Sequence, residues 1–187
     1  MQQSLGTIIG AVFGAVFIFA NAGDPLPFAV VMALRVLAVV GLIVAIASAV
    51  TARRRADAGA DTDAPRPPMF GGKYWLIVVI EFAAIFGGAA LLRALDAPVH
   101  TTIAWVAFVV GVHFIPLAKV WREASILIPA YGLTVLGAVG FAVAFTSAEA
   151  WTPIISGVGS GVLFLSGCVF SGIDMIRARS SSKPDPA

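Results

Sequence analysis

Six long apolar runs, separated by short polar segments, dominate the pattern of the chain. They cover residues 5–20, 28–50, 74–95, 102–118, 125–145 and 153–176. Runs of about this length cross the hydrocarbon core of a bilayer as helices. Because lipid offers no partner for free backbone amides, a spanning segment must be a helix or a strand of a closed barrel, and barrel strands would alternate in polarity. The pattern predicts an all-α integral membrane protein with six transmembrane helices.

The connections between the runs predict three antiparallel hairpins. Residues 1–50 form the first hairpin, 74–118 the second, and 119–176 a short turn followed by the third. The turns "NAGDPLP", "DAPVHTT" and "TSAEAWTP" each place a proline close to the start of the returning run, where its missing amide would have had no partner. Segment 51–73 is rich in Ala, Asp, Pro and Gly, which predicts a flexible loop, and 177–187 is expected to be a disordered tail.

Basic residues indicate the orientation of these hairpins. Ten of the twelve lysines and arginines fall in 51–73, in 119–124 or after residue 176. The positive-inside rule then predicts that these segments and both termini face the cytoplasm, and the Ala/Val/Gly/Arg bias favours the plasma membrane of a bacterium. Only 12% of the residues are charged, about half the share in a soluble domain. The bilayer is the expected partner, and no nucleic-acid partner is expected because the basic residues follow the loops.

The first run has a competing interpretation as a secretory signal peptide, because Ala20-Asn21-Ala22 resembles a cleavage site. However, "MQQSLG" carries no positive charge, and small residues recur every four positions along the run, which favours an uncleaved span packed closely against another helix. Predicted packing positions are Gly6, Gly10, Gly14, Gly88, Gly157 and Gly161. Packing within one chain and formation of a homo-oligomer through the first three glycines both stay open.

Three strongly ionisable side chains lie well inside the predicted spans, namely Arg35, Glu81 and His113. An unpaired charge near the bilayer centre costs roughly 2.5–3.5 kcal/mol on insertion scales, so such residues are typically paired or functional. At about 1.5 Å per residue, Glu81, His113 and Tyr131 lie about 8–10 Å from the predicted cytoplasmic edge. We therefore expect them at one level, with Arg35 either reaching down as their counter-charge or snorkelling to the outer headgroups.

The stretch "GVHFIPLAK" (111–119) strengthens this prediction. Pro116 cannot donate a backbone amide, which leaves the carbonyl of Val112 without its usual helical partner next to His113. Glu81 shares its helical face with Ala84 and Gly88, which predicts that it faces protein and not lipid. The sequence thus predicts a polar pocket in the bundle.

Two hypotheses compete for this pocket of Glu81, His113, Tyr131 and Arg35. In the preferred one, the chain is a small carrier or channel-like protein, and the pocket binds a polar solute or conducts protons. In the second, the chain is a non-transporting membrane subunit with a membrane partner protein, and a buried polar network fixes the register of the helices.

A membrane-embedded enzyme is the least favoured function. The chain contains no HExxH, GxSxG or phosphate-loop motif, each of which carries a recognised chemistry. Cys168 is the single cysteine, so neither an intrachain disulfide nor a thiolate cluster can form. His100, expected in an exposed turn, and His113 are the two histidines, too few for a multi-histidine metal or haem site. We expect neither a metal nor a cofactor.

Overall fold

The structure, a computed structural model, describes residues 2–58 and 71–180. Within these ranges the chain is helical and contains no strand. Five helices are long and apolar enough to cross a membrane, and a sixth is apolar over the shorter stretch Leu5–Asn21. The prediction of an all-helical chain with the composition of a membrane protein is therefore confirmed.

The long helices are α1 (Gln2–Asn21), α2 (Phe28–Ala58), α3 (Gly72–Ala94), α4 (Thr101–Trp121), α5 (Leu127–Val143) and α6 (Gly159–Ser180). Short 3-10 turns, η1 (Ala124–Ile126) and η2 (Glu149–Trp151), follow α4 and α5 respectively. A π-helical turn, η3 (Pro153–Val158), leads directly into α6. Each predicted apolar run thus corresponds to one of the long helices.

Two helices extend further than the sequence pattern predicts. α2 continues through "TARRRADA" to Ala58, so the first part of the predicted 51–73 loop is helical, and α6 continues through "RARS" to Ser180. Alanine and arginine are strong helix formers, and a helix can leave the apolar layer without ending. At the other end of the predicted loop, Gly72 and Lys73 already belong to α3. Residues 59–70 and 181–187 lie outside the described residues.

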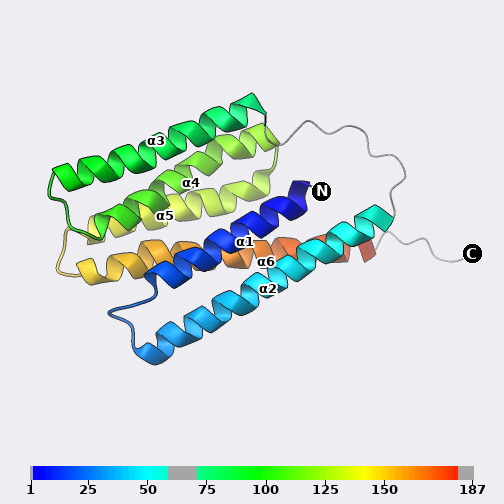
Figure 1. Cartoon of the computed structure of the whole chain (residues 1–187), viewed down its shortest axis with the longest axis horizontal. Helices are drawn as coiled ribbons and strands as arrows, with labels where there is room; N and C mark the ends of the chain where they lie inside the picture. The colour runs from blue at the N-terminus through cyan, green and yellow to red at the C-terminus, as the bar shows by residue number, and fades with distance from the viewer. Residues whose placement is uncertain (1, 59–70, 181–187) are drawn as a thin grey trace, which may run out of the picture.

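The helices form two groups of three (Figure 1). In the first group α1, α2 and α6 pack on one another, and in the second α4 packs against both α3 and α5. The turn η3 contacts α1, α4 and α5, so it joins the two groups. Consecutive helices run in opposite directions, and the start of α1 lies at the same end of the bundle as the end of α6 (Figure 1).

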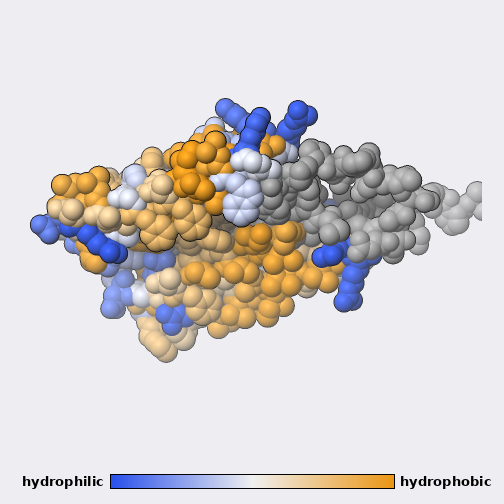
Figure 2. All heavy atoms as spheres, turned by 45° about the horizontal axis from the view of Figure 1, so that its top comes forward, coloured by the Kyte–Doolittle hydropathy of each residue, from blue (hydrophilic) through white to orange (hydrophobic). Residues whose placement is uncertain are grey.

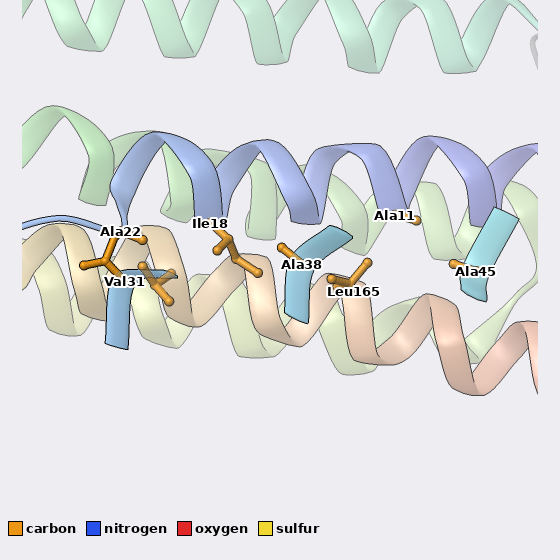
Figure 3. Close-up of a cluster of buried hydrophobic side chains, with 8 residues drawn as sticks. Ala11, Ile18, Ala22, Val31, Ala38, Ala45 and Leu165 are labelled. Atoms are coloured by element: carbon orange, nitrogen blue, oxygen red, sulfur yellow. The ribbon is translucent and has the colours of Figure 1, made fainter. Parts of the chain in front are cut away.

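Aliphatic side chains, half of them alanines, fill the core of the first group (Figure 3). The buried cluster consists of Ala11, Ile18, Ala22, Val31, Ala38, Ala45, Val158 and Leu165. At its centre α1 and α6 meet almost backbone to backbone. A Cβ atom added to Gly14 would lie 2.9 Å from the carbonyl oxygen of Gly161, and one added to Gly161 would lie 2.6 Å from the carbonyl oxygen of Gly14. Gly10 similarly meets Cys168 of α6, so Gly10 and Gly14 are covered within the chain.

The outer surface of the bundle is largely apolar (Figure 2). In that view, apolar residues cover much of the visible face, and hydrophilic residues lie mainly toward the two ends of the helices. Large aliphatic and aromatic side chains are exposed on all six helices, for example Phe13, Leu37, Phe86, Val112, Val135 and Phe170. A surface of this kind is suited to contact with lipid.

Candidate functional site

Glu81 lies on α3, the helix least enclosed by the rest of the bundle. None of the residues of α3 is buried, and its main packing partner is α4. The half-buried residues nevertheless recur with helical spacing, as a single stripe that faces α4: Tyr74, Ile77, Val78, Glu81, Ala84, Ile85, Gly88, Ala89 and Leu92. Glu81 therefore projects toward protein from a helix that is otherwise open to lipid.

His113 of α4 meets Glu81 across this stripe. Its Nδ1 atom lies 2.6 Å from Glu81 Oε2, and the two side chains are only 10% and 13% exposed. The ring nitrogen does not point at the carboxylate with the angle of an N–H···O hydrogen bond, and by that measure it has no partner. The short separation of the two atoms therefore defines the contact.

Aromatic rings pack beside the imidazole of His113. The His113 ring lies edge-on to Phe114, with centroids 4.9 Å apart, and Phe114 in turn lies edge-on to Phe164 of α6 at 5.4 Å. Helix α4 continues through Pro116 to Trp121. The Glu81–His113 pair is therefore enclosed by α3, α4 and one phenyl ring.

Two further contacts tie α3 to α4. The indole N–H of Trp105 donates a hydrogen bond to the carbonyl oxygen of Ala84 at 2.9 Å. Gly88 makes room for this indole, because a Cβ atom there would overlap the ring. At the end of the bundle where α3 begins, the rings of Tyr74 and Trp121 stack with centroids 6.0 Å apart. We call these contacts and the Glu81–His113 pair together the α3–α4 seam.

Trp105 was not among the residues singled out from the sequence. A signal for it exists, since an indole N–H inside an apolar span needs an acceptor. The acceptor is a backbone carbonyl, however, and every residue of α3 carries one. Only the register between α3 and α4 identifies Ala84.

Arg35 does not join the Glu81–His113 pair. Its guanidinium donates a hydrogen bond to the carbonyl oxygen of Ala22 at 3.1 Å and lies 6.0 Å from the centre of the Phe19 ring. Ala22 immediately follows the last residue of α1, so Arg35 places a positive charge at the negative end of that helix. Arg35, predicted as a possible counter-charge for Glu81, thus forms its hydrogen bond within the first group of helices, whereas Glu81 belongs to the second.

Tyr131 does not reach the pair either, although it belongs to α5 of the same group. Its side chain is 56% exposed. The face of α5 that touches α4 carries Thr134, against which Gly111 packs, and Gly137, against which Phe108 packs. Tyr131 lies outside this face, so its hydroxyl belongs to the outer surface. Tyr131 and His113 were predicted at a similar depth in the bundle, but their side chains point in different directions.

An open hollow lies at the end of the bundle where α4 begins. It has a volume of about 590 Å³, and its lining includes Asn21, Asp24, His100, Val106 and Pro153. Val106 and His113 are seven residues apart and therefore share one face of α4, with about 10 Å of helical rise between them. The hollow and the pair thus lie one above the other along α4.

No protein-family model, curated protein or solved structure matches the chain. Among the described residues, no group of three or more His, Cys, Asp or Glu side chains is arranged to hold a metal ion. A function is therefore proposed from the geometry of the site.

Proposed function

We propose that the chain is a non-transporting membrane subunit in which the Glu81–His113 pair positions α3 on α4. The observation that carries the proposal is the 2.6 Å separation between Glu81 and His113. Glu81 comes from α3, a helix that has no buried residue. In lipid, α3 gains little by exchanging acyl chains for the apolar side chains of α4, because both are apolar. Specific contacts must then fix its position.

The spacing of the contacts along the seam supports this role. Tyr74, Glu81 and Gly88 occur at intervals of seven residues, so they lie on one face of α3 and two turns apart. Each meets a different residue of α4, in the order Trp121, His113 and Trp105. This order requires antiparallel helices in a single register. Interhelical polar contacts in membranes contribute about 0.6–2 kcal/mol each, enough to select that register.

A carrier is the second candidate, favoured by the hollow above the pair on α4. In this function a polar solute or a proton enters between Asn21, Asp24 and His100 and passes the layer formed by Val110 and Phe114 to reach Glu81 and His113. Intramembrane carboxylates and histidines form proton relays in transporters. Val110 is 5% exposed and packed against neighbouring helices, so transport requires the two groups of helices to separate there.

The double variant Glu81→Gln/His113→Asn separates the two candidates. Asparagine presents an N–H close to the position of Nδ1, and glutamine keeps a carbonyl oxygen, so a neutral contact persists without an ionisable group. The full-length protein is purified, its thermal unfolding is measured in detergent micelles, and proton flux is measured in liposomes that enclose a pH-sensitive dye. Glu81→Ala/His113→Ala removes the contact and serves as the matched comparison.

For a positioning pair, the amide variant melts close to the wild type, the alanine variant melts lower, and hydrogen exchange in α3 increases in the alanine variant alone. Proton flux stays at the level of empty liposomes for all three proteins. The proposal fails if the wild type carries protons and the well-folded amide variant does not, because that result assigns the pair to a carrier.

A further inference from the structure

The end of the bundle at which α3 begins and α4 ends carries exposed cations around an aromatic stack. Lys73 directly precedes Tyr74, and Arg122 directly follows Trp121, the two residues whose rings stack. Lys119 lies in the last turn of α4. Lys73 and Arg122 thus flank the stack from the start of α3 and the end of α4, and Lys119 lies at the same end of the bundle. We call these three residues the basic cluster (Lys73, Lys119 and Arg122).

The cations of the basic cluster are available to a ligand. All three side chains are exposed. Among the side chains that the structure describes, none of the three forms an ion pair. The nearby carboxylate of Glu123 accepts a hydrogen bond from the hydroxyl of Ser125 at 2.8 Å. The backbone amides at the start of α3 also lack a side-chain cap, so the positive end of that helix adds to the field of the cluster.

Arg122 occupies a position where glycine would be the easier residue. Its backbone has φ 54° and ψ 39°, the left-handed conformation in which helices commonly end with glycine. A side chain in this conformation crowds the following carbonyl. The turn itself therefore does not favour arginine at this position, whereas a charged ligand beside the turn would.

The aromatic residues place the cluster at the height of lipid headgroups. Trp75 is 59% exposed and lies edge-on to Tyr74, with centroids 5.5 Å apart. Tryptophan and tyrosine concentrate where the hydrocarbon meets the headgroups. On the hydrocarbon side of the cluster, Leu76, Val79 and Ile80 of α3 are exposed and apolar. Headgroup phosphate and acyl chains would thus meet matching surfaces of the same helix.

We infer that the basic cluster binds the phosphate headgroup of an anionic phospholipid whose acyl chains lie along α3. Arginine offers a phosphate two parallel N–H groups, and lysine offers a mobile ammonium. Basic pockets between membrane helices recognise anionic headgroups in this manner. The inference is independent of whether the Glu81–His113 pair positions α3 or carries protons.

Native mass spectrometry of the full-length protein tests the inference, with apparent Kd values for dioleoylphosphatidylglycerol and dioleoylphosphatidylcholine. The wild type should prefer the anionic lipid, and Lys119→Gln/Arg122→Gln should lower that preference by about fivefold for each charge removed. Arg53→Gln/Arg54→Gln is the matched control. It removes two exposed charges at the same end of the bundle but from α2, and its preference should stay at the wild-type level.

A second variant separates binding from folding. Arg122→Gly removes one charge and suits the left-handed backbone, so it should melt no lower than the wild type and still lose about fivefold in lipid preference. Equal loss in the control pair would overturn the inference, because general surface charge would then explain binding. Equal affinity of the wild type for the two lipids would also overturn it. Displacement of the anionic lipid by millimolar inorganic phosphate would assign the cluster to a soluble anion instead.

Discussion

The interface of α1 with α6, which we call the α1–α6 seam (Gly10, Gly14, Gly161 and Cys168), and the α3–α4 seam hold helices together by different means. In the α1–α6 seam, backbone meets backbone at Gly14 and Gly161. In the α3–α4 seam, side chains reach across: an imidazole to a carboxylate, an indole to a carbonyl, and one aromatic ring to another.

The contrast follows from the solvent. Inside a bilayer, burial of apolar side chains does not drive helices together, so association depends on close packing or on polar contacts. α1 and α6 carry glycines that allow close packing along their contact. α3 has one such position, Gly88, and its other contacts with α4 come from polar or aromatic side chains. The first seam should therefore tolerate almost no change in volume, and the second should lose stability in separate steps.

Gly161→Ala should produce the largest effect. Its Cβ atom would lie 2.6 Å from the carbonyl oxygen of Gly14 and 3.0 Å from the amide nitrogen of Ile18. Because backbone atoms cannot rotate away, the helices must separate, and we expect a loss of about 2–3 kcal/mol in unfolding free energy. Unfolding in mixed micelles measures it.

Gly167→Ala is the control for this prediction. It lies on the same helix, and a Cβ atom there would meet no atom within 4 Å. Its stability should equal or slightly exceed that of the wild type, since alanine is the better helix former. If both variants lose the same amount, close backbone packing does not explain the α1–α6 seam.

Gly88→Ala should have a smaller effect, of about 1–2 kcal/mol. Its Cβ atom would overlap the indole of Trp105, but a side chain can turn aside. The loss is then mainly the hydrogen bond from Trp105 to the carbonyl of Ala84. Tryptophan fluorescence should report the changed environment of the indole.

The neighbouring residue provides the control on α3. A Cβ atom on Gly87 would meet nothing within 4 Å, so Gly87→Ala should unfold like the wild type. A Gly88→Ala variant as destabilised as Gly161→Ala would remove the distinction between the two seams.

The Glu81–His113 contact should contribute about 0.6–2 kcal/mol of coupling energy, the range found for polar pairs between membrane helices. Glu81→Ala, His113→Ala and the double variant form the cycle that measures it. Additive losses from the two single variants would mean that the two side chains do not interact, despite their separation of 2.6 Å.

The sequence predicted the helices and one of their polar contacts for clear physical reasons. Apolar runs of membrane length leave the backbone no alternative to helices. Glu81 could be assigned to a protein-facing stripe because its neighbours at helical spacing, Ala84 and Gly88, are small. His113 was found because an ionisable group inside an apolar run needs a partner.

The remaining predictions about the pocket rested on depth, and depth was not sufficient. Tyr131 lies at a level similar to that of His113, but the direction of a side chain depends on which face of α5 packs on α4. That face is set by the glycines Gly111 and Gly137, whose contacts cannot be assigned without knowing how the helices pair. For Arg35 the sequence left two alternatives open, a counter-charge for Glu81 or a side chain that snorkels to the outer headgroups, and neither considered the free carbonyl at a helix end, which is an equally good acceptor for a guanidinium.

Arg35→Gln should have the smallest effect, about 0.3–1 kcal/mol. Arg35 donates a hydrogen bond to Ala22 at the end of α1, and a cation at a helix C-terminus typically stabilises by that amount. Arg35→Lys keeps the charge and should recover part of the loss. Unfolding of both variants in mixed micelles measures these differences.

Combining Arg35→Gln with Glu81→Gln tests whether the two groups of helices share one charge network. Arg35 and Glu81 belong to different groups and have no common partner among the described contacts. Distant sites of this kind add within about 0.3–0.5 kcal/mol, so the double variant should lose the sum of the single losses. A larger deviation would restore Arg35 as the counter-charge of Glu81 and would connect the first group of helices to the α3–α4 seam.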